Sequence, residues 1–308
     1  TSLDYILLIL MVSLILAFIA ILIFYFKGLK GSPYELYLLF FTKVTEYSAY
    51  GAAQLAFMFY LREDIGMTDL EAGSYYSGWS ITVTLVTMGV GAICDAIGIK
   101  KTLLIGSFAL LMSRAVMPFT DNVLLATLLG FLPLGFGIAI TGPVLSVGIK
   151  RFTTIEGAAL GFGMFYTLMN VGWAVGAWLF DYMRVNIGET TTFMGNEISV
   201  WQAMFGIGFF INLPDLVAIL LMRDGVEMTE KGIVHHKKEK TGEGMIGGLK
   251  TGIKDTIRIF GSNFAERAFW IFILLIGITV FARLTFFHFH ITWPSYGVRY
   301  FGEGSLIG

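Results

Sequence analysis

Cysteine, histidine and charged side chains are scarce in this sequence, and each shortage excludes a class of protein. The single cysteine, Cys94, cannot form an intramolecular disulfide or a cysteine-based metal cage. Only four histidines are present, and His288 and His290 point to different sides of a helix, so they do not form a chelating pair. We therefore expect no metal, haem or other cofactor. A phosphate-binding loop, a nucleophile elbow and a zinc motif are also absent from the sequence, so we expect a protein that is not an enzyme.

The shortage of charge points to a lipid environment. Charged residues make up 14% of the chain and hydrophobic residues 56%, with a mean hydropathy of +0.75. A soluble domain would carry about 25% charged residues. The basic residues are interleaved with acidic ones and the formal net charge is −1, so we expect no nucleic-acid partner. The composition predicts an integral membrane protein whose surroundings are the lipid bilayer.

Long apolar segments recur along the whole chain. A helix crosses the hydrocarbon core with about 17–25 mostly apolar residues. The first segment is longer than the apolar part of a signal peptide and has no basic region before it, so we expect a retained extra helix. The chain starts with Thr1 and stops soon after the last segment, so we expect both ends to be truncated. Eight such segments are present, covering residues 3–26, 36–61, 72–94, 102–119, 123–149, 157–183, 201–222 and 268–292.

The positions of the basic residues support this assignment. Lys and Arg collect in the cytoplasmic connections of multi-pass proteins. Fifteen of the 21 Lys and Arg residues lie in the alternate connections that follow the first, third, fifth and seventh segments. Only Arg62, Arg184 and Arg299 lie on the other side. The asymmetry predicts that the chain enters from the outside, that residues 36–61 start inside, and that residues 268–292 end outside.

A long cytoplasmic segment separates the last two membrane segments. Its first half, after Arg223, mixes acidic and basic residues, and we expect it to be flexible. Its second half has Leu249, Ile253, Ile257 and Phe260 at helical spacing. This pattern predicts an amphipathic helix, which either lies in the membrane interface or packs on the cytoplasmic face of the bundle.

One motif bridges the 72–94 and 102–119 segments on the cytoplasmic side. Gly91 and Asp95 are one helical turn apart, Gly98 supplies a tight turn, and Lys100 and Lys101 follow. A glycine such as Gly91 lets a neighbouring helix approach. The pattern resembles the signature of the major facilitator superfamily, although Ala96 stands where that family usually has a basic residue. The resemblance covers residues 33 to the end. It implies a transporter of six plus six helices, of which the second half is mostly missing here.

A narrower resemblance involves two membrane segments. Residues 165–172 (FYTLMNVG) and 46–51 (EYSAYG) are similar to motifs of proton-dependent oligopeptide transporters. The paired acids and the arginine of that family's first motif are absent, and Thr42, Thr45 and Glu46 stand there instead.

Charged residues inside the membrane segments are the main functional candidates. A charge at mid-bilayer costs about 2.5–3.5 kcal/mol on insertion scales and usually faces a partner or a wet cavity. Lys43, Glu46 and Tyr50 share one helix face, which we expect to line a central cavity. Glu46 then acts as a proton-coupling carboxylate, with Lys43 or Arg114 as its counter-charge. The alternative is a static salt bridge that fixes packing.

The other candidates are more ambiguous. Asp215 shares a face with Asn212 around Pro214, and it is either a second coupling acid or a structural residue at a bend. Tyr166 and Asn170 are either substrate ligands or members of a helix–helix hydrogen bond. The predicted substrate-binding residues are Lys43, Tyr50, Arg114, Tyr166, Asn170, Arg283 and His290.

The sequence thus predicts an all-α membrane protein with a major-facilitator-type six-helix N-terminal bundle in residues 33–222. Residues 1–32 form the extra helix and a short link, 223–267 the linker, and 268–308 the first helix of an incomplete C-terminal bundle. We expect a secondary transporter that moves a small polar solute by alternating access, coupled to protons. Within this hypothesis, one alternative is a symporter of peptides or of other anionic or zwitterionic solutes. The competing hypothesis is a sensor or accessory protein of the same fold that does not transport.

Overall fold

The computed structural model describes residues 2–235, 254, 258 and 261–302, and most of them are helical. The predicted amphipathic helix of residues 249–264 lies largely outside the described residues. The long helices are α1 (Ser2–Gly28), α2 (Tyr34–Phe59), α3 (Asp69–Ile97), α4 (Ile99–Val116), α6 (Leu132–Arg151), α7 (Ala158–Ile187), α8 (Val200–Leu221) and α10 (Arg267–Phe301). Short helical pieces extend α2 (Tyr60–Asp64) and α4 (Met117–Phe119) and precede α6 (α5, Val123–Leu125, then Ala126–Phe131).

Six of the eight predicted membrane segments are confirmed as helices that can span a membrane. Six of the described helices, α1, α3, α4 with its extension, α5 through α6, α7 and α8, are long and apolar enough to cross a membrane. In α10 the apolar stretch described is Arg267–Phe281. Helix α2 is not among the six because its sequence includes charged and polar side chains such as Lys43 and Glu46. Most of α2 is instead enclosed by other helices, and this enclosure makes its polar residues tolerable in a membrane.

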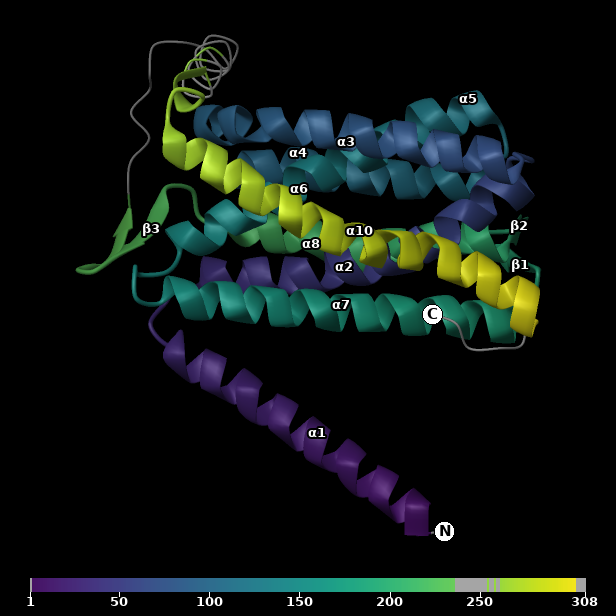
Figure 1. The fold of residues 1–308 in the computed structure, drawn as a ribbon, viewed down its shortest axis with the longest axis horizontal. Helices are drawn as coiled ribbons and strands as arrows, with labels where there is room; N and C mark the ends of the chain where they lie inside the picture. Colours follow the sequence, from purple (N-terminus) through teal and green to yellow (C-terminus); the bar gives the residue numbers. More distant parts are fainter. Residues whose placement is uncertain (1, 236–253, 255–257, 259–260, 303–308) are drawn as a thin grey trace.

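Helix α2 lies at the centre of the bundle. It packs extensively against α7 and α8, while α4 packs against α6 and α8, and α3 packs against α6 (Figure 1). Helix α1 diverges from the bundle and touches mainly α7, so its N-terminal end lies far from the other helices (Figure 1). Its most apolar window has no buried residue.

Two small hairpins were not predicted. Strands β1 (Thr190–Phe193) and β2 (Asn196–Ser199) pair antiparallel between α7 and α8. Strands β3 (Val226–Thr229) and β4 (Gly232–His235) pair in the same way after α8. The hairpins lie at opposite ends of the bundle (Figure 1). The second one corrects the expectation of a flexible segment after Arg223, because Val226 is buried among helix residues and anchors the hairpin.

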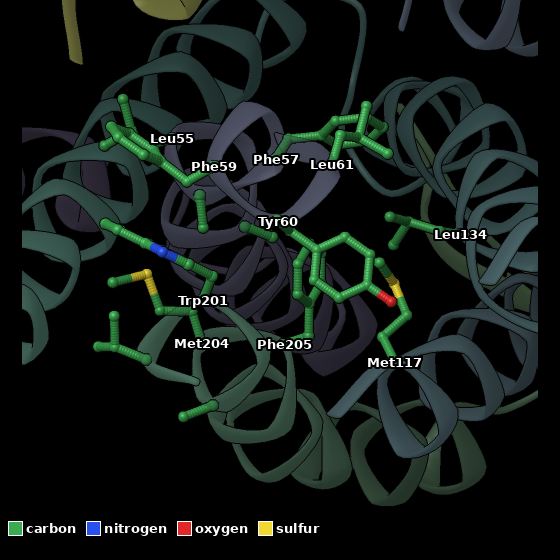
Figure 2. Close-up of a cluster of buried hydrophobic side chains, with 14 of the residues drawn as sticks. Leu55, Phe57, Phe59, Tyr60, Leu61, Met117, Leu134, Trp201, Met204 and Phe205 are labelled. Atoms are coloured by element: carbon green, nitrogen blue, oxygen red, sulfur yellow. The ribbon is translucent and has the colours of Figure 1, made fainter. Parts of the chain in front are cut away.

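Two hydrophobic clusters hold the bundle together. One cluster contains the stacked rings of Phe59 and Trp201, whose centroids are 4.3 Å apart, and it also includes Phe57, Tyr60 and Phe205 (Figure 2). The other includes Leu36, Leu39 and Phe40 of α2 together with residues of α4, α6, α7 and α8. Along α2 and α8, polar and charged residues occupy the stretch between the two clusters.

Ion pairs hold the C-terminal ends of α10 and α8. Arg299 donates to Asp69 at 2.9 Å, and Arg62 donates to the same carboxylate at 3.1 Å. At the end of α8, Arg223 forms two hydrogen bonds, of 2.6 and 2.9 Å, with the buried carboxylate of Glu35. These pairs join α10 and α8 to the ends of α2 and α3.

Candidate functional site

Charged side chains from several helices are buried in the interior of the bundle. Lys43 and Glu46 of α2 are 2% and 3% exposed, Arg114 of α4 is fully buried, and Asp215 of α8 is 2% exposed. Each carries a formal charge that water would normally stabilise, so such a group persists inside a membrane protein only with partners or a function. The structure brings all four predicted residues into one region.

Glu46 has one oxygen that is hydrogen-bonded and one that is not. The hydroxyl of Thr141, on α6, donates to Oε1 at 2.7 Å. Within the described part of the chain, Oε2 is buried and has no hydrogen-bond partner. Lys43 and Arg114 both act on this carboxylate electrostatically. The group therefore has spare hydrogen-bonding capacity next to two cations.

Arg114 is the most isolated of the charged groups. Its Nε, Nη1 and Nη2 atoms are all buried and have no hydrogen-bond partner among the described residues. Its side chain packs against Gly208 of α8, where an added Cβ would lie 3.1 Å from the Arg114 Cδ. Electrostatic interactions reach it from Glu46 and Asp215. A guanidinium has five N–H donors, and in Arg114 none is used by the described protein groups.

Asp215 is better satisfied than Glu46. Its Oδ1 accepts a hydrogen bond from the Thr45 hydroxyl, and its Oδ2 accepts one of 2.6 Å from Asn212 Nδ2. The bond to Thr45 connects α8 to α2, because the two residues lie on different helices. Asp215 therefore has a clear structural contribution as well as a charge.

Lys43 lies against aromatic rings. Its Nζ atom is 3.7 Å from the ring centroid of Tyr47 and 4.1 Å from that of Phe165, on α7. The faces of aromatic rings attract cations. The predicted neighbour Tyr50 is half-buried, and its ring packs edge-to-face on Trp173 with centroids 5.4 Å apart. The predicted shared face of Lys43, Glu46 and Tyr50 is thus enclosed by the bundle and by α7.

Small residues allow this enclosure. A Cβ added to Gly176 of α7 would lie 2.7 Å from the Ser48 backbone oxygen, and one added to Gly172 would lie 2.8 Å from that of Val44. Both distances are shorter than a Cβ atom can approach a neighbouring atom, so there is no room for a side chain at either glycine. The backbones of α2 and α7 are therefore in direct contact there. These two glycines therefore allow the close packing of the two helices. Their contact fixes α2, and with it Lys43 and Glu46, against α7.

Other predicted ligands lie elsewhere. Tyr166 is 52% exposed, and Asn170 is exposed and donates to the Tyr166 carbonyl oxygen. Asn170 lines a groove between α1 and α7, away from the buried charges. Arg283 and His290 belong to α10, but their side chains lie outside what the structure describes.

The motif between α3 and α4 is partly as predicted. Gly98 has φ of +88°, which confirms the tight turn between α3 and α4. Lys100 donates to the carbonyl oxygens of Leu220 and Met222 at 2.8 and 2.7 Å, so it caps the C-terminal end of α8. The expectation for Gly91 is wrong for this structure: outside its own helix, no described atom lies within 4 Å of an added Cβ. Asp95 and Lys101 are exposed.

Sequence reasoning missed the uncharged members of the site. Thr141 bonds Glu46, Thr45 bonds Asp215, and Gln54 donates to the hydroxyl of Tyr76. Threonine is common in membrane helices, where its hydroxyl often bonds its own backbone, as Thr141 also does with Gly137. The only available signal was its position among apolar residues.

Helices long and apolar enough to span a membrane surround a buried set of opposite charges, which is the arrangement of a multi-pass membrane protein. The sequence profile of the Major Facilitator Superfamily matches residues 36–308, and the chain belongs to this family. It is therefore an integral membrane transporter of small-molecule solutes. The match begins at α2 and leaves out α1. A search of curated proteins found no match to the chain.

Proposed function

We propose that the protein is a proton-coupled secondary transporter that works by alternating access, with Glu46 as the coupling carboxylate. The observation that carries the proposal is that the Oε2 atom of Glu46 and the guanidinium of Arg114, which interact electrostatically, are both buried and have no hydrogen-bond partner among the described residues. A static ion pair would be expected to satisfy both groups, because unpaired buried charges are costly. A carboxylate that changes partner or protonation during a cycle needs such spare capacity.

The cations at the site favour an anionic or zwitterionic solute. Arg114 offers donors in the fork geometry that matches a carboxylate or phosphate. Lys43 is held by aromatic rings, which stabilise a cation and leave its charge available to a nearby anion. In this proposal, protonation of Glu46 weakens its attraction for both cations, and the solute's anionic group takes its place. Asp215 serves as a second acid that also ties α8 to α2.

The test is uptake by the complete gene product in proteoliposomes, with and without a pH gradient. A panel of carboxylates, phosphorylated compounds and dipeptides serves as the solute set. We expect a pH gradient to drive uptake of at least one anionic or zwitterionic solute, and we expect Glu46→Gln to abolish this acceleration. Glu156→Gln, an exposed acid near the start of α7, is the matched control and should behave as wild type.

Two results would contradict the proposal. Gradient-driven uptake that Glu46→Gln leaves unchanged would remove Glu46 from the coupling role. Uptake that proceeds equally with and without the gradient would remove proton coupling altogether, while the membership in a transporter family would stand.

A further inference from the structure

A second polar feature lies at the cytoplasmic end of the bundle, away from the buried charges. A pocket of about 560 Å³ opens between the start of α4, the end of α6 and the β3–β4 hairpin. Its lining combines apolar side chains with an excess of basic ones over acidic ones. The basic residues are Lys100, Lys101, Arg151, Arg223 and His235, and the acidic ones are Asp95 and Asp224.

Two of the basic groups are already engaged. Lys100 donates to the carbonyl oxygens at the end of α8, and Arg223 is paired with Glu35. Lys101 and Arg151 are exposed, and neither has an ion pair with any residue that the structure describes. These two side chains, from α4 and α6, are therefore the cations that the pocket offers to a ligand.

The start of α4 adds donors to the same pocket. Gly98 precedes the helix and provides no side-chain cap, and the first helical residues, Ile99 to Lys101, line the pocket. The first N–H groups of a helix lack partners within the helix and favour an anion. On the side of the pocket formed by the start of α4, the helix N-terminus and the two cations without a described ion-pair partner therefore favour an anion.

The pocket has an exposed apolar side chain at its edge, next to the cations. Val147 lines it and is 44% exposed, and it lies one turn before Arg151 on the same face of α6. The basic connections of the chain place this end of the bundle on the cytoplasmic side, at the depth of the lipid headgroups. A ligand with a phosphate next to an apolar tail fits such a lining better than a free phosphate compound does.

We propose that this pocket binds the headgroup of an anionic phospholipid of the cytoplasmic leaflet, with Lys101 and Arg151 holding its phosphate. Asp95 and Asp224 line the pocket as well and exclude the anion from their part of it, so the phosphate is confined to the side of α4 and α6. The inference is independent of the transport mechanism, because it rests on residues that take no part in the buried cluster.

Native mass spectrometry of the complete gene product tests the proposal. The protein is taken from phosphatidylcholine membranes and titrated with phosphatidylglycerol. We expect tight retention of phosphatidylglycerol by the wild type. Each lost cation should weaken binding by roughly 5-fold, as expected for a basic residue near an anionic surface, so Lys101→Gln/Arg151→Gln should bind many-fold more weakly.

The chain provides a matched control next to the site. Lys150 is exposed and adjacent to Arg151 but does not line the pocket, so Lys150→Gln should leave retention unchanged. The charge-preserving double variant Lys101→Arg/Arg151→Lys should restore binding. An equal loss in Lys150→Gln would overturn the proposal, because it would show unspecific attraction to the basic surface.

A second arm separates a lipid from a soluble source of phosphate. Inorganic phosphate and glycerol 3-phosphate are added to the detergent-solubilised protein during the lipid titration. We expect neither to displace phosphatidylglycerol at millimolar concentration. Displacement by glycerol 3-phosphate at concentrations where it binds alone would overturn the lipid assignment in favour of a soluble phosphorylated compound.

Discussion

At the scale of single residues, the buried charges differ in how well they are satisfied. Asp215 accepts hydrogen bonds on both oxygens, whereas Glu46 uses only one, and Arg114 uses none of its donors among the described residues. Removing one partner of a buried ion pair usually destabilises a protein strongly, while removing both can be neutral. The interaction between Glu46 and Arg114 can therefore be measured.

We predict that changes at these two positions are not additive. Arg114→Met removes one of the two cations that act on the buried Glu46 carboxylate, and adding Glu46→Gln should relieve part of the lost stability. A double-mutant cycle of unfolding free energies in detergent should give a coupling of about 0.5–3 kcal/mol. Arg114→Met combined with Glu156→Gln is the control pair and should show additive effects. Additivity in the Glu46 pair would show that the two groups do not interact.

At the scale of helices, the contact between α2 and α7 determines the surroundings of the site. This contact depends on glycine because each backbone fills the space where the other helix would carry a side chain. Lys43 lies between Tyr47 of α2 and Phe165 of α7. A small displacement of α7 would therefore change the environment of Lys43 as well as the packing.

We predict that Gly176→Ala destabilises the protein by about 1–3 kcal/mol, as overpacking commonly does. The added Cβ would meet the backbones of Ser48 and Ala52 at 2.7 and 2.8 Å, and backbone atoms cannot rotate away. Gly91→Ala is the control, because its Cβ meets no described atom of another element. Thermal unfolding in detergent should show a lower midpoint than wild type for Gly176→Ala and no decrease in the midpoint for Gly91→Ala. Equal effects would contradict the packing argument.

At the scale of the whole molecule, the end of the bundle that carries the β1–β2 hairpin is closed by contacts that join distant parts of the chain. Asp64, just after α2, accepts a hydrogen bond of 2.8 Å from Ser199 at the start of α8. Burial raises the pKa of Asp64 to about 6, because its effect and that of the nearby acidic residues outweigh the hydrogen bond from Ser199, which lowers the pKa. The unfolded chain should have the ordinary aspartate pKa of about 3.9.

We predict that this carboxyl lowers stability as the pH rises from about 4 to about 6. In that window the folded protein holds more protons than the unfolded chain, so the free energy of unfolding decreases with pH. The Asp64→Asn variant has no titrating group there, and its thermal midpoint should depend less on pH. Melting curves at several pH values in detergent provide the measurement, with Glu156→Gln as the control. An unchanged pH profile in Asp64→Asn would contradict the assignment.

The sequence alone was sufficient to predict the membrane helices and their alternation. Eight apolar segments, the placement of basic residues and the Gly98 turn required only local composition, because each helix satisfies its own backbone hydrogen bonds in lipid. The capping box that Thr68 and Glu71 form at the start of α3 is a local feature of the same kind. The charges in α2, α4 and α8 were noticeable for the same reason, since a charge is conspicuous in an apolar segment.

Only the tertiary structure decided which of these residues meet. It placed Thr141 on Glu46 and Thr45 on Asp215, left Tyr166 and Asn170 on another surface, and formed the hairpin after Arg223. Helical periodicity assigns a residue to a face, but it does not say which neighbouring helix covers that face. That choice depends on packing between segments far apart in the chain, such as the close glycine contact of α2 with α7.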